Sequence, residues 1–241
     1  MMGFTKPRRP APGMCRRNSR RARGFSMIEL AVSLAVIGLL ASAAAAYTGL
    51  LRSGNQLNAD AQLASLSEGV MAFARTRQRL PCPDTAGTGY EALVANACPP
   101  GIAVGWLPYL SIGLSQPPAQ QRAIYGVYRN PIADLAASAT LASLGVAAGQ
   151  ATANTFVYVT GDGTTANGAE NCASNVVSNP AYVILAPGED RNGNGLPVDG
   201  LHSTLPGIGL CFAAPTRGLD TNFDDRTLAV SAYAVMAKLN Q

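Results

Sequence analysis

The chain has 241 residues, of which 48% are hydrophobic and only 13% are charged, with 25 glycines and 16 prolines. This length allows one ordinary domain with extensions, and the composition favours a secreted, loop-rich protein over a cytosolic helical enzyme. Eight of the 18 basic residues and none of the 14 acids lie in residues 1–24, so the rest of the chain has a net charge of −4. The net positive charge of the chain therefore comes from residues 1–24, and we expect no nucleic-acid partner.

The leader of residues 1–24 is followed by a long apolar segment. Residues 30–51 form a run of 22 positions without a charged side chain, and Arg52 ends the run. About 20 apolar residues suffice for a helix to cross the hydrocarbon core of a bilayer. The basic flank predicts a cytoplasmic N-terminus. The alternative is an ordinary secretory signal, with an apolar core of about 7–15 residues and an exit site such as Ala41–Ala46. The longer run favours a single membrane-spanning helix.

The junction between leader and apolar segment carries a recognisable motif. It reads Gly24-Phe25-Ser26-Met27-Ile28-Glu29-Leu30. This motif resembles the type IV prepilin signature, which has Gly before the cut, an aromatic residue after it and Glu at the fifth mature position. The resemblance implies that a prepilin peptidase cleaves between Gly24 and Phe25 and methylates the new amine of Phe25. It covers about the first fifty residues, and it departs at Ala46, where many members have Pro.

Glu29 is a candidate assembly residue for a physical reason as well. A carboxylate inside an apolar membrane segment costs on the order of several kcal/mol unless it is paired, so such a residue marks a functional position. Cleavage would free the amine of Phe25 as a positive partner. The resemblance implies that Glu29 of an incoming subunit pairs with the N-terminal amine of the previous one and sets axial register. The alternative is a Glu that lies in the headgroup layer without a pairing role.

The apolar segment continues into an amphipathic helix. Apolar side chains recur there at helical spacing, at Leu63, Leu66, Val70 and Phe73. Proline at positions 81 and 83 ends the pattern. We therefore predict one long helix over residues 25–79, of which 25–51 form the transmembrane and assembly half.

Residues 80–241 are predicted to form a periplasmic or extracellular globular domain. Strands are expected at Phe156–Thr160 and Tyr182–Leu185, and a short helix within Ala133–Ala153. The segment Leu228–Leu239 is ambiguous between strand and helix. The expected fold class is α+β, with a small antiparallel sheet packed against the long N-terminal helix in a pilin-like arrangement.

Four of the five cysteines lie beyond the apolar segment, at Cys82, Cys98, Cys172 and Cys211. An even set outside the membrane indicates two disulfides in an oxidising compartment, and the spacings do not fit paired CxxC zinc knuckles. Proximity in sequence favours Cys82 with Cys98 and Cys172 with Cys211, although four cysteines allow three connectivities.

The segment from Asp190 to Gly195 places oxygen-bearing side chains at the first, third and fifth positions, as a calcium loop does. The candidate ligands of a structural Ca²⁺ are Asp190, Asn192, Asn194 and, later in the loop, Asp199. The twelfth position is Leu201 and not Glu, so a polar turn without metal is the alternative. No cofactor is required by this interpretation.

The sequence does not indicate an enzyme. His202 is the only histidine, and it lies in a Gly/Pro-rich loop where we expect a surface position. None of the common nucleophile, zinc or phosphate-binding motifs surrounds it. The acidic pair Asp224-Asp225 is expected in a turn or at a helix cap.

These features predict a filament subunit of a type IV pilus or a type II secretion system, between which the sequence does not decide. The mature chain of 217 residues is larger than a typical major pilin needs, which favours a minor pilin or pseudopilin. Expected partners are the prepilin peptidase, other pilin subunits, the inner-membrane assembly platform and the lipid bilayer. Expected locations are the inner membrane, as a single-pass protein, and then the filament. The alternative function is a pilus-borne binding module whose C-terminal domain recognises an adhesion target, DNA or a secreted substrate.

Overall fold

The computed structural model describes residues 26–150, 152, 155–160, 176–190, 195, 197–207, 209–218 and 223–240. The leader and the Gly24–Phe25 junction therefore lie outside the described residues. The chain divides into two compact units, residues 1–52 and residues 53–241. One helix, α1 (Met27–Arg77), contributes residues to both units. Its bounds fall within the predicted helix of residues 25–79.

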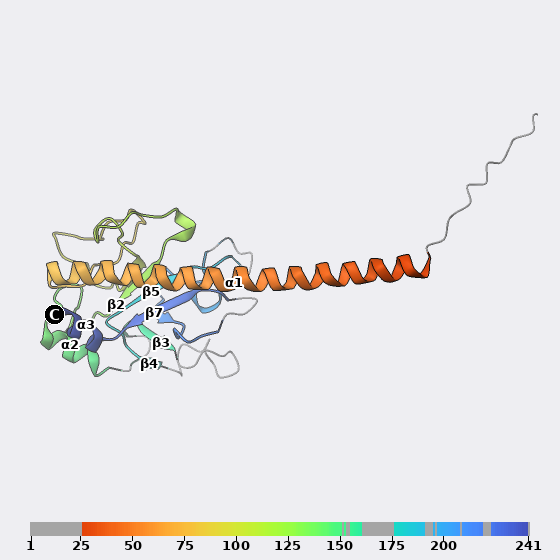
Figure 1. The fold of residues 1–241 in the computed structure, drawn as a ribbon. Coiled ribbons are helices and arrows are strands. Elements are labelled where there is room, and N and C mark those ends of the chain that lie inside the picture. The colour runs from red at the N-terminus through yellow and green to blue at the C-terminus, as the bar shows by residue number, and fades with distance from the viewer. Residues whose placement is uncertain are drawn as a thin grey trace, which may run out of the picture. The chain divides into compact units, whose positions relative to one another are not determined.

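The second unit is α+β (Figure 1). Its strands are β1 (Val104–Trp106), β2 (Ile124–Val127), β3 (Tyr158–Thr160), β4 (Val176–Ser178), β5 (Tyr182–Ala186), β6 (Cys211–Phe212) and β7 (Arg226–Val230). Its further helices are α2 (Leu141–Ala148) and α3 (Ala232–Leu239), with short 3-10 turns η1 (Ala119–Gln121) and η3 (Gly200–His202).

The first sheet has the strand order β1-β2-β5-β7, and all its neighbouring strands are antiparallel. Side chains alternate along β5, so that Tyr182 and Ile184 belong to one core cluster while Val183 and Leu185 belong to another. Both faces of this strand are therefore buried, and the first sheet is a central layer.

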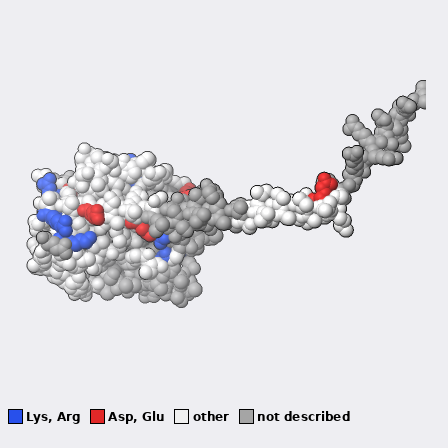
Figure 2. Space-filling model, viewed as in Figure 1, with Lys and Arg blue, Asp and Glu red and all other residues white. Residues whose placement is uncertain are grey.

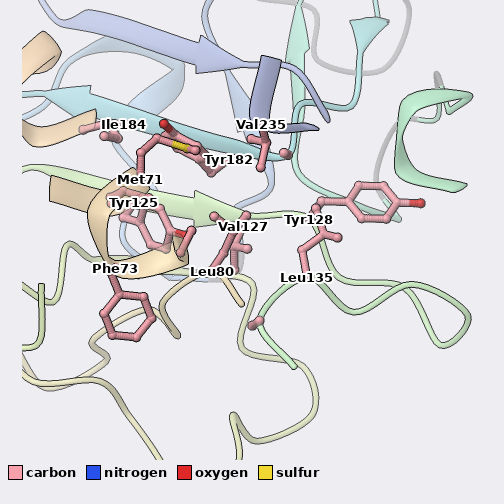
Figure 3. Close-up of a cluster of buried hydrophobic side chains, with 14 of the residues drawn as sticks. Met71, Phe73, Leu80, Tyr125, Val127, Tyr128, Leu135, Tyr182, Ile184 and Val235 are labelled. Carbon is pink, nitrogen blue, oxygen red and sulfur yellow. The ribbon is translucent and has the colours of Figure 1, made fainter. Parts of the chain in front are cut away.

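The second half of α1 packs in the core that contains one face of this sheet. Its apolar residues Leu63, Leu66, Val70, Met71, Phe73 and Ala74 are buried there. Figure 3 shows Met71 among the strand residues Tyr125 and Tyr182, and Val235 of α3 in the same cluster. A buried hydrogen bond of 2.8 Å joins Ser67 Oγ to the Tyr182 hydroxyl. The predicted packing of an amphipathic helix on an antiparallel sheet is thus present.

A second sheet, in the order β4-β3-β6, contributes to the core on the other face. Here β3 pairs with β6 in parallel, which the prediction of a small antiparallel sheet did not include. The two sheets come close at Gly126 of β2, where a Cβ atom would lie 3.1 Å from both Phe212 and Val157. Glycine at this position therefore allows the close approach of the layers.

Three other predicted elements are present with sharper bounds. The predicted strand over 156–160 is β3, and the helix predicted within 133–153 is α2, whose first turn is capped by the Thr140 side chain. The ambiguous segment over 228–239 contains both a strand and a helix. Its change of structure occurs at Ser231, whose side chain accepts a hydrogen bond from Ala234 N and begins α3.

Candidate functional site

The start of α1 is fixed by a serine one residue after the predicted cleavage junction. Ser26 Oγ accepts a hydrogen bond of 3.3 Å from the backbone N–H of Glu29. The Ser26 carbonyl accepts bonds from the backbone N–H groups of Glu29 and Leu30. Ser26 is therefore the N-cap of α1, and the Ser-x-x-Glu spacing is that of a capping box.

Glu29 lies in the first turn of α1 and is exposed. The unpaired N–H groups of a helix N-terminus favour a negative charge, so this location stabilises the carboxylate. Gly24 and Phe25 precede the described residues. The predicted pairing of Glu29 with the amine of Phe25 therefore stays a prediction.

The residues that follow Glu29 present apolar side chains in all directions. Large apolar side chains from Met27 to Leu40 are between 48% and 89% exposed. The described side chains from Leu30 to Ser42 include no charge. A helix that is apolar all round is normally buried by something, and no apolar partner covers this stretch among the described residues.

Among the residues that the structure describes, none of the helices combines the length and hydropathy that crossing a membrane needs. The membrane span over residues 30–51 stays a prediction.

His202 is buried, which corrects the expected surface position. Its Nδ1 lies 2.8 Å from Asp225 Oδ2, and both side chains are fully buried. Its Nε2 accepts a hydrogen bond of 2.9 Å from Ala213 N. Because Nε2 is an acceptor, the ring proton is at Nδ1 and is donated to Asp225. Both ring nitrogens are therefore used in holding the fold.

Asp225 is likewise buried, and it directly precedes β7 instead of lying in the expected turn or helix cap. It also accepts backbone hydrogen bonds from Gly188 (3.1 Å) and Asp199 (3.0 Å). The carboxylate thus joins β7 to two loops and to His202. Sequence reasoning missed this group because its members lie up to 37 residues apart in the chain.

The predicted calcium loop is only partly described. Asp190 Oδ2 accepts a hydrogen bond of 2.7 Å from Gly195 N, which is a loop-closing contact. Asp199 is buried, whereas Asn192 and Asn194 lie outside the described residues. Within the described ranges, no group of three or more His, Cys, Asp or Glu side chains is placed to hold a metal ion. The Ca²⁺ site stays a prediction.

One predicted disulfide is present, between Cys82 and Cys98, with a Cα–Cα distance of 5.5 Å. Cys211 is also disulfide-bonded. Cys172 lies outside the described residues, so its predicted pairing with Cys211 stays a prediction. The segment that Cys82 begins is further held by Glu91, whose carboxylate binds Arg79 and accepts the Cys82 N–H at 2.6 Å.

A comparison with known protein families gives a match that includes the start of α1. Residues 19–45 match the family model described as the prokaryotic N-terminal methylation motif. The chain carries this motif, which is the signature of type IV pilins and pseudopilins. The matched residues include the Gly24–Phe25 junction, Glu29 and the exposed apolar stretch of α1. No curated protein and no solved structure matches the chain.

Proposed function

We propose that the chain is a subunit of a type IV pilus or type II secretion filament that assembles through the first part of α1. The motif at residues 19–45 carries this proposal. Its support from the structure is the exposed apolar surface of residues 27–42, which begins beside an acidic residue at a capped helix start. The function is structural, and the partners are the prepilin peptidase, other subunits, the assembly platform and the bilayer.

In this proposal the peptidase removes residues 1–24 and methylates Phe25. The helix is retained in the inner membrane, where hydrocarbon covers its apolar side chains. On assembly the same side chains contact neighbouring helices, and Glu29 pairs with the amine of a neighbouring Phe25. A charge pair in a medium of low dielectric is strong enough to select one register among several.

The size of residues 80–241 supports a minor subunit over a major one, because the resemblance implies that major pilins need less. Quantitative mass spectrometry of purified filaments tests this assignment. A minor subunit is present at a few copies per filament, whereas a major subunit accounts for most of the mass. The alternative is a pilus-borne binding module. Filaments that still form without this subunit but no longer bind a specific ligand would favour that alternative.

Glu29→Gln tests the assembly role most sharply, because it removes the charge and keeps the size. We expect cleavage and the stability of the second unit to be unchanged, and incorporation into filaments to fall by about tenfold or more. The matched control is Glu68→Gln, which changes an exposed acid on the same helix within the second unit. Equal incorporation of both variants would contradict the pairing role. Loss of cleavage in Glu29→Gln would assign the residue to peptidase recognition instead.

A further inference from the structure

The two edges of the first sheet differ. The β1 edge is closed, because Trp106 exchanges two backbone hydrogen bonds with Asp84, of 2.9 Å from Asp84 N and 2.7 Å from Trp106 N. A Cβ atom on Gly105 would lie 2.6 Å from the Asp84 carbonyl oxygen, so glycine permits this close approach. The opposite edge strand, β7, is paired with β5 on one side alone (Figure 1).

The outer side of β7 has no backbone partner in the described chain. The strand pairs with β5 from Arg226, opposite Ala186, to Val230, opposite Tyr182. One further bond joins Ala181 N to Val230 O, on the same side as β5. Among the described residues, no other backbone group outside these pairings bonds to the strand. Because N–H and C=O groups alternate between the two sides of a strand, part of the β7 backbone points away from the sheet.

The strand β7 lacks most of the features with which proteins protect an open edge. Such features are a very short strand, a bulge, a proline or charged side chains, lysine above all. The strand has five residues, Arg-Thr-Leu-Ala-Val, and its pairing contains no register shift. Its one charge is at its first residue. An edge of this kind is a template for an added strand.

The two faces of β7 determine which side chains an added strand needs. Leu228 and Val230 pack against the core that contains α1, whereas Ala229 packs against the core that contains the second sheet. An added strand would continue both layers. It therefore needs apolar side chains opposite Leu228 and Val230, and small or β-branched ones opposite Thr227 and Ala229.

Arg226 adds a charge requirement at the start of the strand. It lies on the same face as Leu228 and Val230, and its side chain is 22% exposed. Asp60 Oδ1 lies 4.0 Å from its Nε, beyond hydrogen-bond range, and this Nε has no acceptor among the described residues. Charged side chains are few on the described surface that Figure 2 shows, so a cation at a strand edge is a distinguishing feature. A carboxylate opposite Arg226 would form a cross-strand ion pair.

We propose that β7 accepts an extended segment of a partner protein as a fifth, antiparallel strand of the first sheet. From its N-terminus, the segment carries apolar, small, apolar, small and acidic residues, which lie opposite Val230 to Arg226 in turn. Main-chain hydrogen bonds provide the affinity, and the alternate side chains provide the specificity. The contact uses the domain and not the apolar stretch of α1. It therefore goes beyond the proposed assembly role and gives the binding-module alternative a class of ligand.

A labelled peptide tests this contact on the full, processed chain in mild detergent. The probe is a blocked peptide with the core Val-Thr-Val-Thr-Glu, and its binding is measured by fluorescence polarisation. Hydrogen exchange of the segment Arg226–Val230 should slow when the peptide is bound. Arg226→Glu should weaken binding by about tenfold or more, and a peptide with Lys in place of its Glu should restore it. The matched control is Arg77→Glu, which reverses an exposed charge at the end of α1 and should have little effect.

Methylated peptides separate main-chain pairing from side-chain contact. Two further peptides carry N-methyl groups on both valines or on both threonines, which removes alternate N–H groups and keeps the side chains. One of these sets points toward β7, so one peptide should bind about tenfold more weakly than the other.

Three results would overturn the added strand. They are equal affinities of the two methylated peptides, no saturable binding of the parent peptide, and unchanged exchange in β7. A chain that is dimeric without peptide, with the β7 amides already protected, would assign the edge to a second copy and contradict a separate partner. All these results leave the filament function standing, whereas failure of cleavage at Gly24 would overturn that function by itself.

Discussion

Two stretches of one helix both carry large apolar side chains, but their surroundings are opposite. In residues 27–42 of α1 the large apolar side chains are exposed, with Leu34 at 62%. In residues 63–74 the large apolar side chains are buried, with Leu66 at 6% and Val70 at 0%. The second stretch packs in the core of its own domain. The first has no such partner in the described chain, so its apolar surface is suited to lipid or to other subunits.

The largest effect is expected at the leader junction. Gly24→Arg places a bulky charged side chain at the predicted cut and should abolish cleavage, so that the chain keeps its 24 leader residues. The domain of residues 53–241 should unfold at the same temperature as before, because the substitution lies in the other unit. Intact-mass measurement and thermal unfolding check the two statements. Normal cleavage of this variant would show that Gly24 is not required for processing.

A substitution at the buried Asp225 should affect only the domain of residues 53–241. Asp225→Ala leaves the Nδ1–H of His202 and the backbone N–H groups of Gly188 and Asp199 without their acceptor in the core. We expect a loss of about 3–5 kcal/mol in the free energy of unfolding, measured with urea, and unchanged cleavage after Gly24. The control Glu189→Ala removes an exposed acid and should change stability by less than about 0.5 kcal/mol. Equal stabilities would show that the buried group does not hold the domain.

A matched pair of leucines sharpens the comparison along the helix. Leu66→Ala removes a buried side chain and should cost about 2–5 kcal/mol in the free energy of unfolding of the domain. Leu34→Ala removes an exposed one and should leave that free energy unchanged. Incorporation into filaments should show the reverse order for chains that remain folded. If Leu34→Ala destabilised the domain as strongly as Leu66→Ala, the division of the helix would be wrong.

Two tyrosines in the core give the smallest expected effect. The hydroxyl of Tyr182 is bonded to Ser67, whereas the buried hydroxyl of Tyr125 has no hydrogen-bond partner in the described structure. Tyr182→Phe should therefore cost about 1 kcal/mol, and Tyr125→Phe should be neutral or stabilising. Urea unfolding of both variants measures the difference, and an equal loss in both would contradict it.

Tyr182 also contributes to a loss of stability at alkaline pH. Burial raises the pKa of Tyr182 to about 12, and the bond from Ser67 lowers it only in part. The unfolded chain releases this proton near pH 10, so between about pH 10 and 12 the folded state binds more protons and stability falls as pH rises. The contribution is fully present below pH 10. Tyr182→Phe should show a shallower fall than the wild-type protein over that range.

Local patterns were sufficient to predict α1, β3, β5 and the Cys82–Cys98 bridge. Helical spacing at Leu63, Leu66 and Val70 specifies a buried face without knowledge of what covers it. The split of the last segment at Ser231 is also a local feature, since the serine caps α3. A close reading of that N-cap could have resolved the ambiguity.

Contacts between residues far apart in the sequence could not be predicted from local patterns. The strands β1 and β2 have three and four residues, too few to show an alternating pattern in a segment rich in Gly and Pro. The burial of His202 depends on Asp225, 23 residues later, and on the Ala213 N–H. A lone histidine in a polar loop carries no signal of such partners. The residues of the candidate assembly site are contiguous in sequence, so a local motif was enough to propose them, and their role stays a prediction.

The N-terminus of the wild-type protein tests the central claim most directly. The full chain is coexpressed with a prepilin peptidase and extracted from membranes, and its N-terminal peptide is identified by mass spectrometry. The account predicts a chain that begins at Phe25, is shorter by 24 residues and carries a methyl group on the new amine. Cleavage near Ala46, which would remove Glu29 and the exposed apolar stretch of α1, would contradict it.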